Sequence, residues 1–320
     1  MNRSQRVVLF GECMLELQGE AFGTLRQTFG GDTLNTAVYL SRLAGPRGLD
    51  VQYATGLGED CLSDGLLSRW HAEGVGTELV RRIPSRVPGM YMIEVDAHGE
   101  RRFAYWRDTS AAKAYFDGVA PGATPLEAAV DTIAVLYVSG ISLAILPAAG
   151  RERLFALMAA LRARGAVVAF DNNYRPRLWP VVAAARDAFA QAFGLATIAF
   201  VTADDHQALL GLHSLDEGVE AARALPTPEL VIKRGSAPTL VRNDGRWHDA
   251  ATVPVARVVD TTAAGDSFAA GYLSRRLLGA SAVDAARFGN RVAARVIQHP
   301  GALIRREAMT DLIEDASFIA

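Results

Sequence analysis

In this 320-residue sequence, the residue best placed to do chemistry is an aspartate near the start of a helical pattern. Asp266 follows a run of small residues and opens a stretch with the apolar spacing of a helix. Small residues let backbone N–H groups approach an anion, and a helix N-terminus adds partial positive charge. The segment is therefore a candidate phosphate or oxyanion cradle, with Asp266 as a candidate general base. An acidic residue in a first helical turn is also commonly a cap, so spacing alone leaves both roles open.

A second glycine-rich segment comes directly before a helical pattern over 33–43. Gly30 and Gly31 would let the backbone approach a ligand closely. Asp32 and Asn35 could then form hydrogen bonds with ligand hydroxyl groups. The alternative is an ordinary loop whose polar residues cap the helix.

Arginines and tyrosines in two other segments could bind an anionic ligand. Arg175 follows the strand-like run 167–170, so it lies near the sheet edge where open α/β sheets bind ligands. Its guanidinium can present a planar fork to a carboxylate or phosphate. Arg107 lies two residues after Tyr105 in a strand-like run, so both side chains face one side. Taken alone, Tyr91 and Tyr105 are better explained as side chains that cover the inner face of a hairpin than as ligands. Arg107 is likewise better explained as a solvated charge at a sheet edge.

Short apolar strands that alternate with helices must position these residues. This alternation is typical of a parallel sheet covered by helices on both faces. A further strand-like run over 255–259 comes before the Asp266 segment. The other strands are expected over 7–10, 51–55, 133–138, 167–170, 198–202 and 230–233, and the helices over 33–43, 151–164 and from about 264 and 282.

One region breaks the alternation of strands and helices. Polar and apolar residues mix in two expected strands, 90–96 and 101–107, which bracket a hairpin turn at 97–100. The segment 12–19 could supply another strand beside them. We therefore expect a small, partly solvated sheet over the main domain, and a second hairpin at 239–248.

The composition excludes several classes of protein. Half of the residues are hydrophobic, and 33 Lys and Arg against 35 Asp and Glu give a net charge of −2. A disordered chain is excluded, and no nucleic-acid partner is expected. The two cysteines, Cys13 and Cys61, cannot be a disulfide framework, so we expect buried, reduced thiols in a cytoplasmic protein. Gly140 and Pro147 interrupt the uncharged stretch 132–150, so no membrane-spanning helix is expected.

The Asp266 segment resembles the C-terminal signature of the ribokinase-like (PfkB-type) carbohydrate kinases. That signature has an acidic residue, Thr, any residue, two small residues, Gly and Asp. The matching segment is Asp260-Thr261-Thr262-Ala263-Ala264-Gly265-Asp266. The resemblance implies that Asp266 deprotonates the sugar hydroxyl that attacks the γ-phosphate of ATP. It also implies that Ala263, Ala264 and Gly265 supply the anion hole.

The glycine-rich segment is similar to the N-terminal signature of the same family. Asp32 and Thr33 stand where the family usually has a small residue and a proline, while the spacing of Gly and Asn is kept. The resemblance implies that Gly31, Asp32 and Asn35 bind the substrate. It also implies one ribokinase-like α/β domain over 1–320.

The resemblance implies a particular architecture for that domain. A mostly parallel central sheet is covered by helices on both faces, and a small β-sheet forms a lid. The lid strands are drawn from about 12–19 and 89–108. A homo-oligomer through the lid sheet is expected by analogy.

The chain closely resembles the 2-keto-3-deoxygluconate kinase subgroup of the family from about residue 7 to residue 309. The resemblance is carried by the segments 11–14, 30–35, 139–144, 171–179 and 301–302 and by the hairpin residues 91 and 105–107. The resemblance implies that Tyr91, Tyr105, Arg107 and Arg175 hold the carboxylate and hydroxyls of a sugar acid. Arg175 is also expected to be catalytic, because it and Arg107 would neutralise the transferring phosphate. The implied reaction is ATP-dependent phosphorylation of 2-keto-3-deoxy-D-gluconate to its 6-phosphate. The alternatives are a kinase of a neutral sugar such as fructose, and a catalytically inactive regulator that binds a sugar acid.

The resemblance also implies sites for ATP and for cations. Most family members have an Asn-x-x-Glu pattern associated with Mg²⁺ where this chain has Thr202 and Asp205. Asp205 could hold a metal-bound water or could cap the following helix. Asp260 and Thr262 fit a monovalent-cation site, and the resemblance leaves open whether such a cation is required. The implied nucleotide-binding residues are Asn173, Lys233, Gly235, Ser236, Ala264, Gly265 and Asn290.

Overall fold

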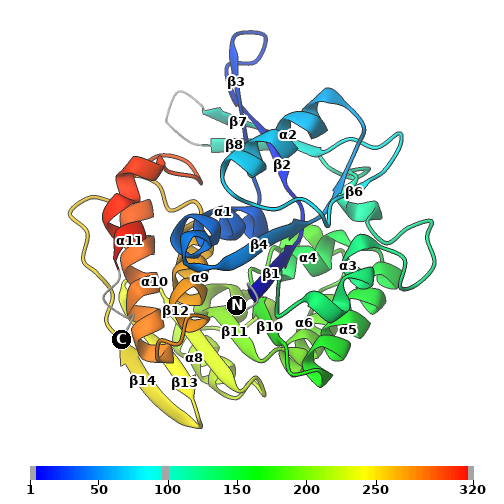
Figure 1. The fold of residues 1–320 in the computed structure, drawn as a ribbon. Helices are drawn as coiled ribbons and strands as arrows, with labels where there is room; N and C mark the ends of the chain where they lie inside the picture. The colour runs from blue at the N-terminus through cyan, green and yellow to red at the C-terminus, as the bar shows by residue number, and fades with distance from the viewer. Residues whose placement is uncertain (1–4, 96–100, 316–320) are drawn as a thin grey trace.

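A large mixed sheet runs through the molecule in the computed structural model, which describes residues 5–95 and 101–315 (Figure 1). In spatial order the strands are β14 (Arg246–Ala250), β13 (Ala237–Asn243), β12 (Glu229–Arg234), β11 (Ile198–Thr202), β10 (Val167–Asp171), β9 (Val135–Ser139), β1 (Gln5–Phe10) and β4 (Leu49–Ala54). Neighbouring strands are parallel from β12 to β4, while β13 pairs antiparallel with both β12 and β14.

Helices cover both faces of this sheet, which explains why its central strands are almost continuously hydrophobic. Val7 and Leu9 of β1 pack into one core, and Val8 and Phe10 pack into the other. The first core contains α1 (Asp32–Ala44), α2 (Cys61–Ala72), α9 (Ala264–Arg276), α10 (Ala282–Val296) and α11 (Thr310–Glu314). The second contains α3 (Pro125–Ala128), α4 (Gly140–Ile145), α5 (Ala148–Ala163), α6 (Val182–Leu195), α7 (Ala203–Leu210) and α8 (Leu215–Arg223).

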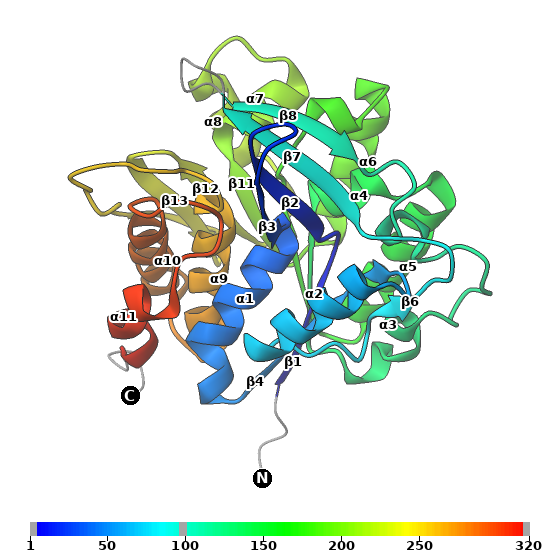
Figure 2. The same ribbon diagram turned by 90° about the horizontal axis from the view of Figure 1, so that it is seen from above.

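A second, four-stranded sheet lies at one end of the large sheet (Figures 1 and 2). We call it the small sheet. Its strands, in spatial order, are β3 (Leu25–Gly30), β2 (Met14–Gly19), β7 (Gly89–Val95) and β8 (Arg101–Trp106). The pairing of β2 with β7 is parallel, and the outer strands pair antiparallel. The remaining short elements are β5 (Gly56–Leu57), β6 (Arg81–Arg82), η1 (Gly45–Arg47), η2 (Ala112–Ala114), η3 (Val130–Thr132), η4 (Pro176–Leu178) and η5 (Arg306–Met309).

The structure confirms the predicted alternation of strands and helices. The helices expected from about residues 264 and 282 are α9 and α10, and the helix expected over 33–43 is α1. The strands expected over 90–96 and 101–107 are β7 and β8, while the turn 97–100 lies outside the described residues. The additional strand is β2, and the second hairpin joins β13 to β14.

Two expectations need correction, and one strand was not foreseen. The strand-like run 255–259 forms no strand, because the N–H of Val259 bonds the carbonyl of Ile297 after α10 instead of a neighbouring strand. Strand β3 was not expected, since its residues show no clean alternation of polar and apolar types. Cys13 is buried as expected, whereas Cys61 is exposed at the first position of α2.

None of the helices within residues 5–95 and 101–315 has the length and apolar character needed to cross a membrane.

Candidate active site

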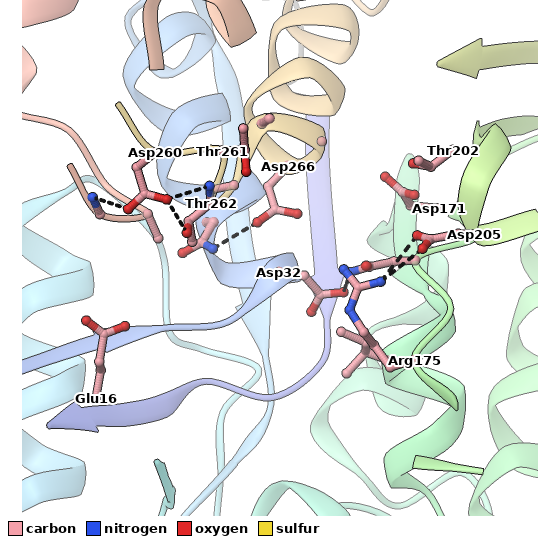
Figure 3. A pocket seen from close by; sticks show the side chains of 18 of the residues that line it. Glu16, Asp32, Asp171, Arg175, Thr202, Asp205, Asp260, Thr261, Thr262 and Asp266 are labelled. Carbon is pink, nitrogen blue, oxygen red and sulfur yellow. Dashed lines mark hydrogen bonds and ion pairs between the residues drawn. The ribbon is translucent and has the colours of Figure 1, made fainter. Parts of the chain in front are cut away.

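A cavity of about 550 Å³ lies where the small sheet faces the carboxyl ends of the large-sheet strands (Figure 3). Asp171 ends β10, Thr202 ends β11, and Lys233 lies near the end of β12, and all three line the cavity. Glu16 and Tyr91 of the small sheet also line it. This is the edge at which open α/β sheets place their ligands.

Asp266 lies in the first turn of α9 and faces this cavity. The N-cap of α9 is Ala263, which has a left-handed backbone (φ 60°) and no side-chain capping bond. Asp266 is therefore not the N-cap. Its Oδ2 accepts a hydrogen bond from Nδ2 of Asn35 at 2.9 Å. The consecutive small residues Ala263, Ala264 and Gly265 line the same cavity. The tertiary structure therefore brings this small-residue run next to the glycine-rich segment that contains Asn35.

The environment of Asp266 makes its carboxylate an unusually strong base. Desolvation and the negative charge of Asp32 raise the pKa of Asp266 to about 8, against the opposing effects of Asn35 and Lys233. A general base works best when its pKa is near the operating pH. Perturbed carboxylates of this kind cluster at functional sites.

Asp32 and Asn35 lie in the first turn of α1, beneath the small sheet. Asn173 donates from Nδ2 to Oδ2 of Asp32 at 2.7 Å, and desolvation raises the pKa of Asp32. Oδ1 of Asn35 is buried and has no hydrogen-bond partner among the described residues, which leaves an acceptor for a ligand. At Gly31 a Cβ atom would lie 2.2 Å from the carbonyl oxygen of Glu12, so any side chain would collide with that loop.

Lys233 is held beside the small-residue run by a buried carboxylate. Its Nζ lies 3.0 and 3.3 Å from the two carboxylate oxygens of Asp171, which also accepts from the Tyr137 hydroxyl at 3.2 Å. A Cβ atom built on Gly265 would lie 3.2 Å from Nζ, so the ammonium group is next to the start of α9. Sequence reasoning named Lys233 but missed Asp171 and Tyr137. The position of Asp171 directly after an apolar run was an available signal.

Arg175 and Asp205 form an ion pair on another wall of the cavity (Figure 3). Nη1 of Arg175 lies 3.2 and 3.3 Å from the two carboxylate oxygens of Asp205. The Arg175 side chain is 50% exposed, so an incoming anion can reach it. Desolvation raises the pKa of Asp205, and Arg175 opposes that shift. Within the described ranges, no group of three or more His, Cys, Asp or Glu is arranged to hold a metal ion by protein ligands alone.

The predicted tyrosine and arginine cluster of the small sheet is only partly in the cavity. Tyr91 lines it and donates its hydroxyl proton to Glu16, a residue that sequence reasoning missed. Tyr105 pairs with Tyr91 across the strands, with ring centroids 5.9 Å apart, but is not among the lining residues. Arg107 is also absent from the lining. Its Nε and Nη2 both donate to Oε2 of Glu12, and the Nε distance is 2.9 Å.

Several predicted nucleotide residues lie outside this cavity. Gly235 and Ser236 form the exposed turn between β12 and β13. Asn290 on α10 is buried, where it bonds Thr239 and the carbonyls of Ala250 and its neighbour. Those contacts tie α10 to the antiparallel end of the large sheet. A nucleotide role for these residues stays a prediction.

Comparisons with known proteins agree with this architecture. Residues 4–308 match the model of the pfkB family carbohydrate kinases. Proteins named 2-dehydro-3-deoxygluconokinase from Dickeya dadantii (strain 3937) and Escherichia coli (strain K12) are 46% and 45% identical to this chain over 309 residues. Each match covers 96% of this chain and 99% of the relative.

A solved structure shares the fold along almost the whole chain. The crystal structure of a 2-dehydro-3-deoxygluconokinase from Thermotoga maritima has a TM-score of 0.80 and 23% identity. The match covers 97% of this chain and 98% of that chain. Its likeness confirms the predicted ribokinase-like fold with its small separate sheet. The chain therefore belongs to the pfkB family of carbohydrate kinases and is an ATP-dependent sugar kinase.

Proposed function

We propose that this protein phosphorylates 2-keto-3-deoxy-D-gluconate to its 6-phosphate with ATP as the phosphoryl donor. The observation that carries the chemistry is the Asp266 carboxylate, which faces the cavity at the start of α9. The sugar acid is supported by relatives 46% and 45% identical over nearly their full lengths that are named 2-dehydro-3-deoxygluconokinase.

In the proposed reaction, Asp266 removes the proton from the 6-hydroxyl of the sugar acid. The hydroxyl oxygen attacks the γ-phosphorus in line, and the bond to the β-phosphate oxygen breaks to release ADP. Asn35 donates to Oδ2 of Asp266 at 2.9 Å and so orients the carboxylate. The pKa of about 8 gives Asp266 a stronger drive to take a proton than an ordinary carboxylate has.

The start of α9 and Lys233 are proposed to stabilise the negative charge of the transferred group. Ala263, Ala264 and Gly265 carry no side chain beyond a methyl group, so an anion can approach their backbone closely. The Ala264 N–H donates to the Thr261 carbonyl at 3.1 Å, and it would exchange that bond for one to the anion. The Lys233 ammonium lies next to Gly265 and is fixed by Asp171. Preorganised donors and cations of this kind supply most of the catalysis in phosphoryl transfer.

Mg²⁺ is proposed to accompany ATP at the Asp205 side of the cavity. The lining residues there include the carboxylates of Asp171, Asp204 and Asp205, and hard oxygen ligands suit Mg²⁺. Mg²⁺ usually keeps several waters and needs only one or two carboxylates besides phosphate, so this set fits without a protein-only cage. When bound, the ion would neutralise phosphate charge. Asp205 would hold it through a water molecule.

Arg175 is proposed to bind the carboxylate of the sugar acid. Its guanidinium is half-exposed in the cavity wall, whereas Arg107 is already neutralised by Glu12. Arg107 and Tyr105 would then support the small sheet and not contact the substrate directly. We propose that this sheet closes over the site as a lid and so excludes water. Residues 1–320 would work as one kinase domain.

The small sheet is also the proposed contact of a homo-oligomer. Phe22 at the tip of the β2–β3 hairpin and Trp106 at the end of β8 are large, exposed hydrophobic side chains on this sheet. Light scattering of the purified protein would measure the mass in solution. A monomer at micromolar concentration would contradict this part of the proposal.

A substrate panel tests the function directly. ADP release is measured with MgATP and 2-keto-3-deoxygluconate, its galactonate epimer, fructose or ribose as the acceptor. We expect the highest kcat/KM with a sugar acid and no turnover in excess chelator. Higher kcat/KM with fructose would favour a neutral-sugar kinase. Binding of the acid without ADP release would favour a regulator.

A further inference from the structure

Glu16 is a carboxylate at the centre of the small sheet that the proposed reaction does not use. It lies on β2, is 9% exposed and lines the cavity. Its Oε1 accepts from Nε2 of Gln18 at 2.7 Å and from Oγ1 of Thr28 at 3.0 Å, and its Oε2 accepts from the Tyr91 hydroxyl. Glu16 thus binds donors from β2, β3 and β7 at once.

These bonds decide what Tyr91 can offer to a substrate. A phenolic hydroxyl has one proton to donate, and an ionised carboxylate can only accept. Because Tyr91 gives its proton to Glu16, only its oxygen lone pairs remain for the cavity. Desolvation and the charge of Glu16 raise the pKa of Tyr91 well above its usual value, so the hydroxyl stays protonated.

The surroundings hold Tyr91 in this role. Its ring lies against Tyr105 with centroids 5.9 Å apart, and the two residues face each other in the β7–β8 pairing. The adjacent Thr28 hydroxyl is likewise committed as a donor to Glu16. The wall around Tyr91 therefore presents acceptors and one negative charge, with the second N–H of the Gln18 amide as the remaining donor. Figure 3 shows Glu16 and Arg175 at opposite sides of the view, so this wall is separate from the proposed carboxylate site.

We propose that Glu16 is a specificity-determining residue, which makes Tyr91 a hydrogen-bond acceptor for a chain hydroxyl of the substrate. A second effect of Glu16 is to disfavour a substrate carboxylate at this wall, because two negative charges would meet there. This inference rests on the proposed sugar-acid kinase activity and deepens it. It narrows the expectation that Tyr91 helps to hold the carboxylate and hydroxyls of the sugar acid, because it assigns Tyr91 to a hydroxyl and not to the carboxylate.

The test crosses protein variants with substrate analogues. The analogues of 2-keto-3-deoxygluconate are two deoxy compounds, each without one of the 4- and 5-hydroxyls, and a carboxamide that lacks the negative charge. For each protein, the ratio of kcat/KM for the parent to that for the analogue is measured. In the wild type, one deoxy compound should show a penalty. Tyr91→Phe should shrink that penalty by about 2–12-fold, the range expected for one neutral hydrogen bond.

Glu16→Gln separates the proposed role from a packing role. A glutamine can donate its amide N–H to one lone pair of the Tyr91 oxygen, which weakens Tyr91 as an acceptor for the substrate hydroxyl. This variant should therefore shrink the same deoxy penalty and leave the carboxamide penalty unchanged. The matched control is Glu94→Gln, which removes one exposed charge from β7 and should change neither ratio. Thermal melts verify that each variant is folded.

Two results would overturn the inference. One is a Tyr91→Phe variant that shrinks the carboxamide penalty but neither deoxy penalty, since Tyr91 would then contact the carboxylate. The other is a Glu16→Gln variant with wild-type ratios for every analogue. If the wild type phosphorylates fructose and not the acid, the proposed function fails by itself. The same ratios with fructose and its deoxy analogues then decide the role of Glu16.

Discussion

The two ends of the cavity are built in different ways. At the start of α9, the candidate base and anion hole come from consecutive residues, Ala263 to Asp266, and the expected chemistry uses the backbone. In the small sheet, the groups that matter are side-chain pairs between distant segments. Tyr91 in the cavity wall bonds Glu16 across 75 positions, and Arg107, just outside the lining, bonds Glu12 across 95 positions.

This difference teaches how each end responds to substitution. A backbone site depends on local residue size and on one carboxylate, so single substitutions should affect turnover with little effect on stability. A buried pair depends on both members, because loss of one leaves the other without a partner. The side chains of Glu12 and Arg107 are only 1% and 11% exposed. We therefore expect stability effects in the small sheet and catalytic effects at α9.

The largest expected effect is at the α9 end. Asp266→Asn should lower kcat by about 10²–10⁴-fold, the usual contribution of a positioned general base, and leave ATP affinity nearly unchanged. ADP release and nucleotide titration measure the two quantities. Asp284→Asn, in the exposed first turn of α10, is the matched control. A folded Asp266→Asn enzyme with more than a tenth of wild-type turnover would rule out the assigned base.

The next effect concerns the stability of the small-sheet end. Arg107→Met leaves the carboxylate of Glu12 buried without its partner, which should lower the free energy of unfolding by about 3–5 kcal/mol. Urea denaturation measures the change. The double variant Glu12→Gln/Arg107→Met should recover much of the loss, because no buried charge remains. A stable Arg107→Met protein that has lost only its affinity for the sugar acid would instead make Arg107 a substrate ligand.

A smaller effect should separate charged from neutral substrates. Arg175→Ala should lower kcat/KM for the sugar acid by about 10–150-fold, since a hydrogen bond to a charged group contributes roughly 1.5–3 kcal/mol. Activity on fructose should fall much less, because fructose has no carboxylate. Arg177→Ala, which removes a nearby exposed arginine, is the control. Equal losses on both substrates would place Arg175 on the phosphate side of the reaction.

The smallest expected effect is the change in kcat/KM for each pH unit. Desolvation and Asp32 raise the pKa of Asp266 to about 8, so the base is protonated at lower pH in the free enzyme. The value of kcat/KM should therefore rise about tenfold per pH unit below 8 and level off above it. Initial rates between pH 6 and 9 with MgATP and the sugar acid both well below their KM values measure this profile. A flat profile over that range would show that Asp266 is already ionised at pH 6.

Sequence patterns were sufficient for the fold and for placing Asp266 and the small residues before it at the start of a helix. The alternation of strands and helices predicted the large sheet, and a contiguous motif predicted that Asp266 starts a helix beside small residues. Both follow from local physics, since hydrophobic periodicity and helix termini depend on neighbours along the chain. Strand β3 was missed because its mixed residues carry no such period.

Only the tertiary structure decided how the charged groups are paired. The sequence contains Glu12, Glu16, Arg107 and Asp171. No spacing reveals that Glu12 pairs with Arg107 or that Asp171 pairs with Lys233. The same holds for the direction of the Tyr91 proton, which Glu16 fixes from another strand. Pairing of this kind depends on which distant segments the fold brings together. A residue's type states only that it can donate, accept or carry a charge.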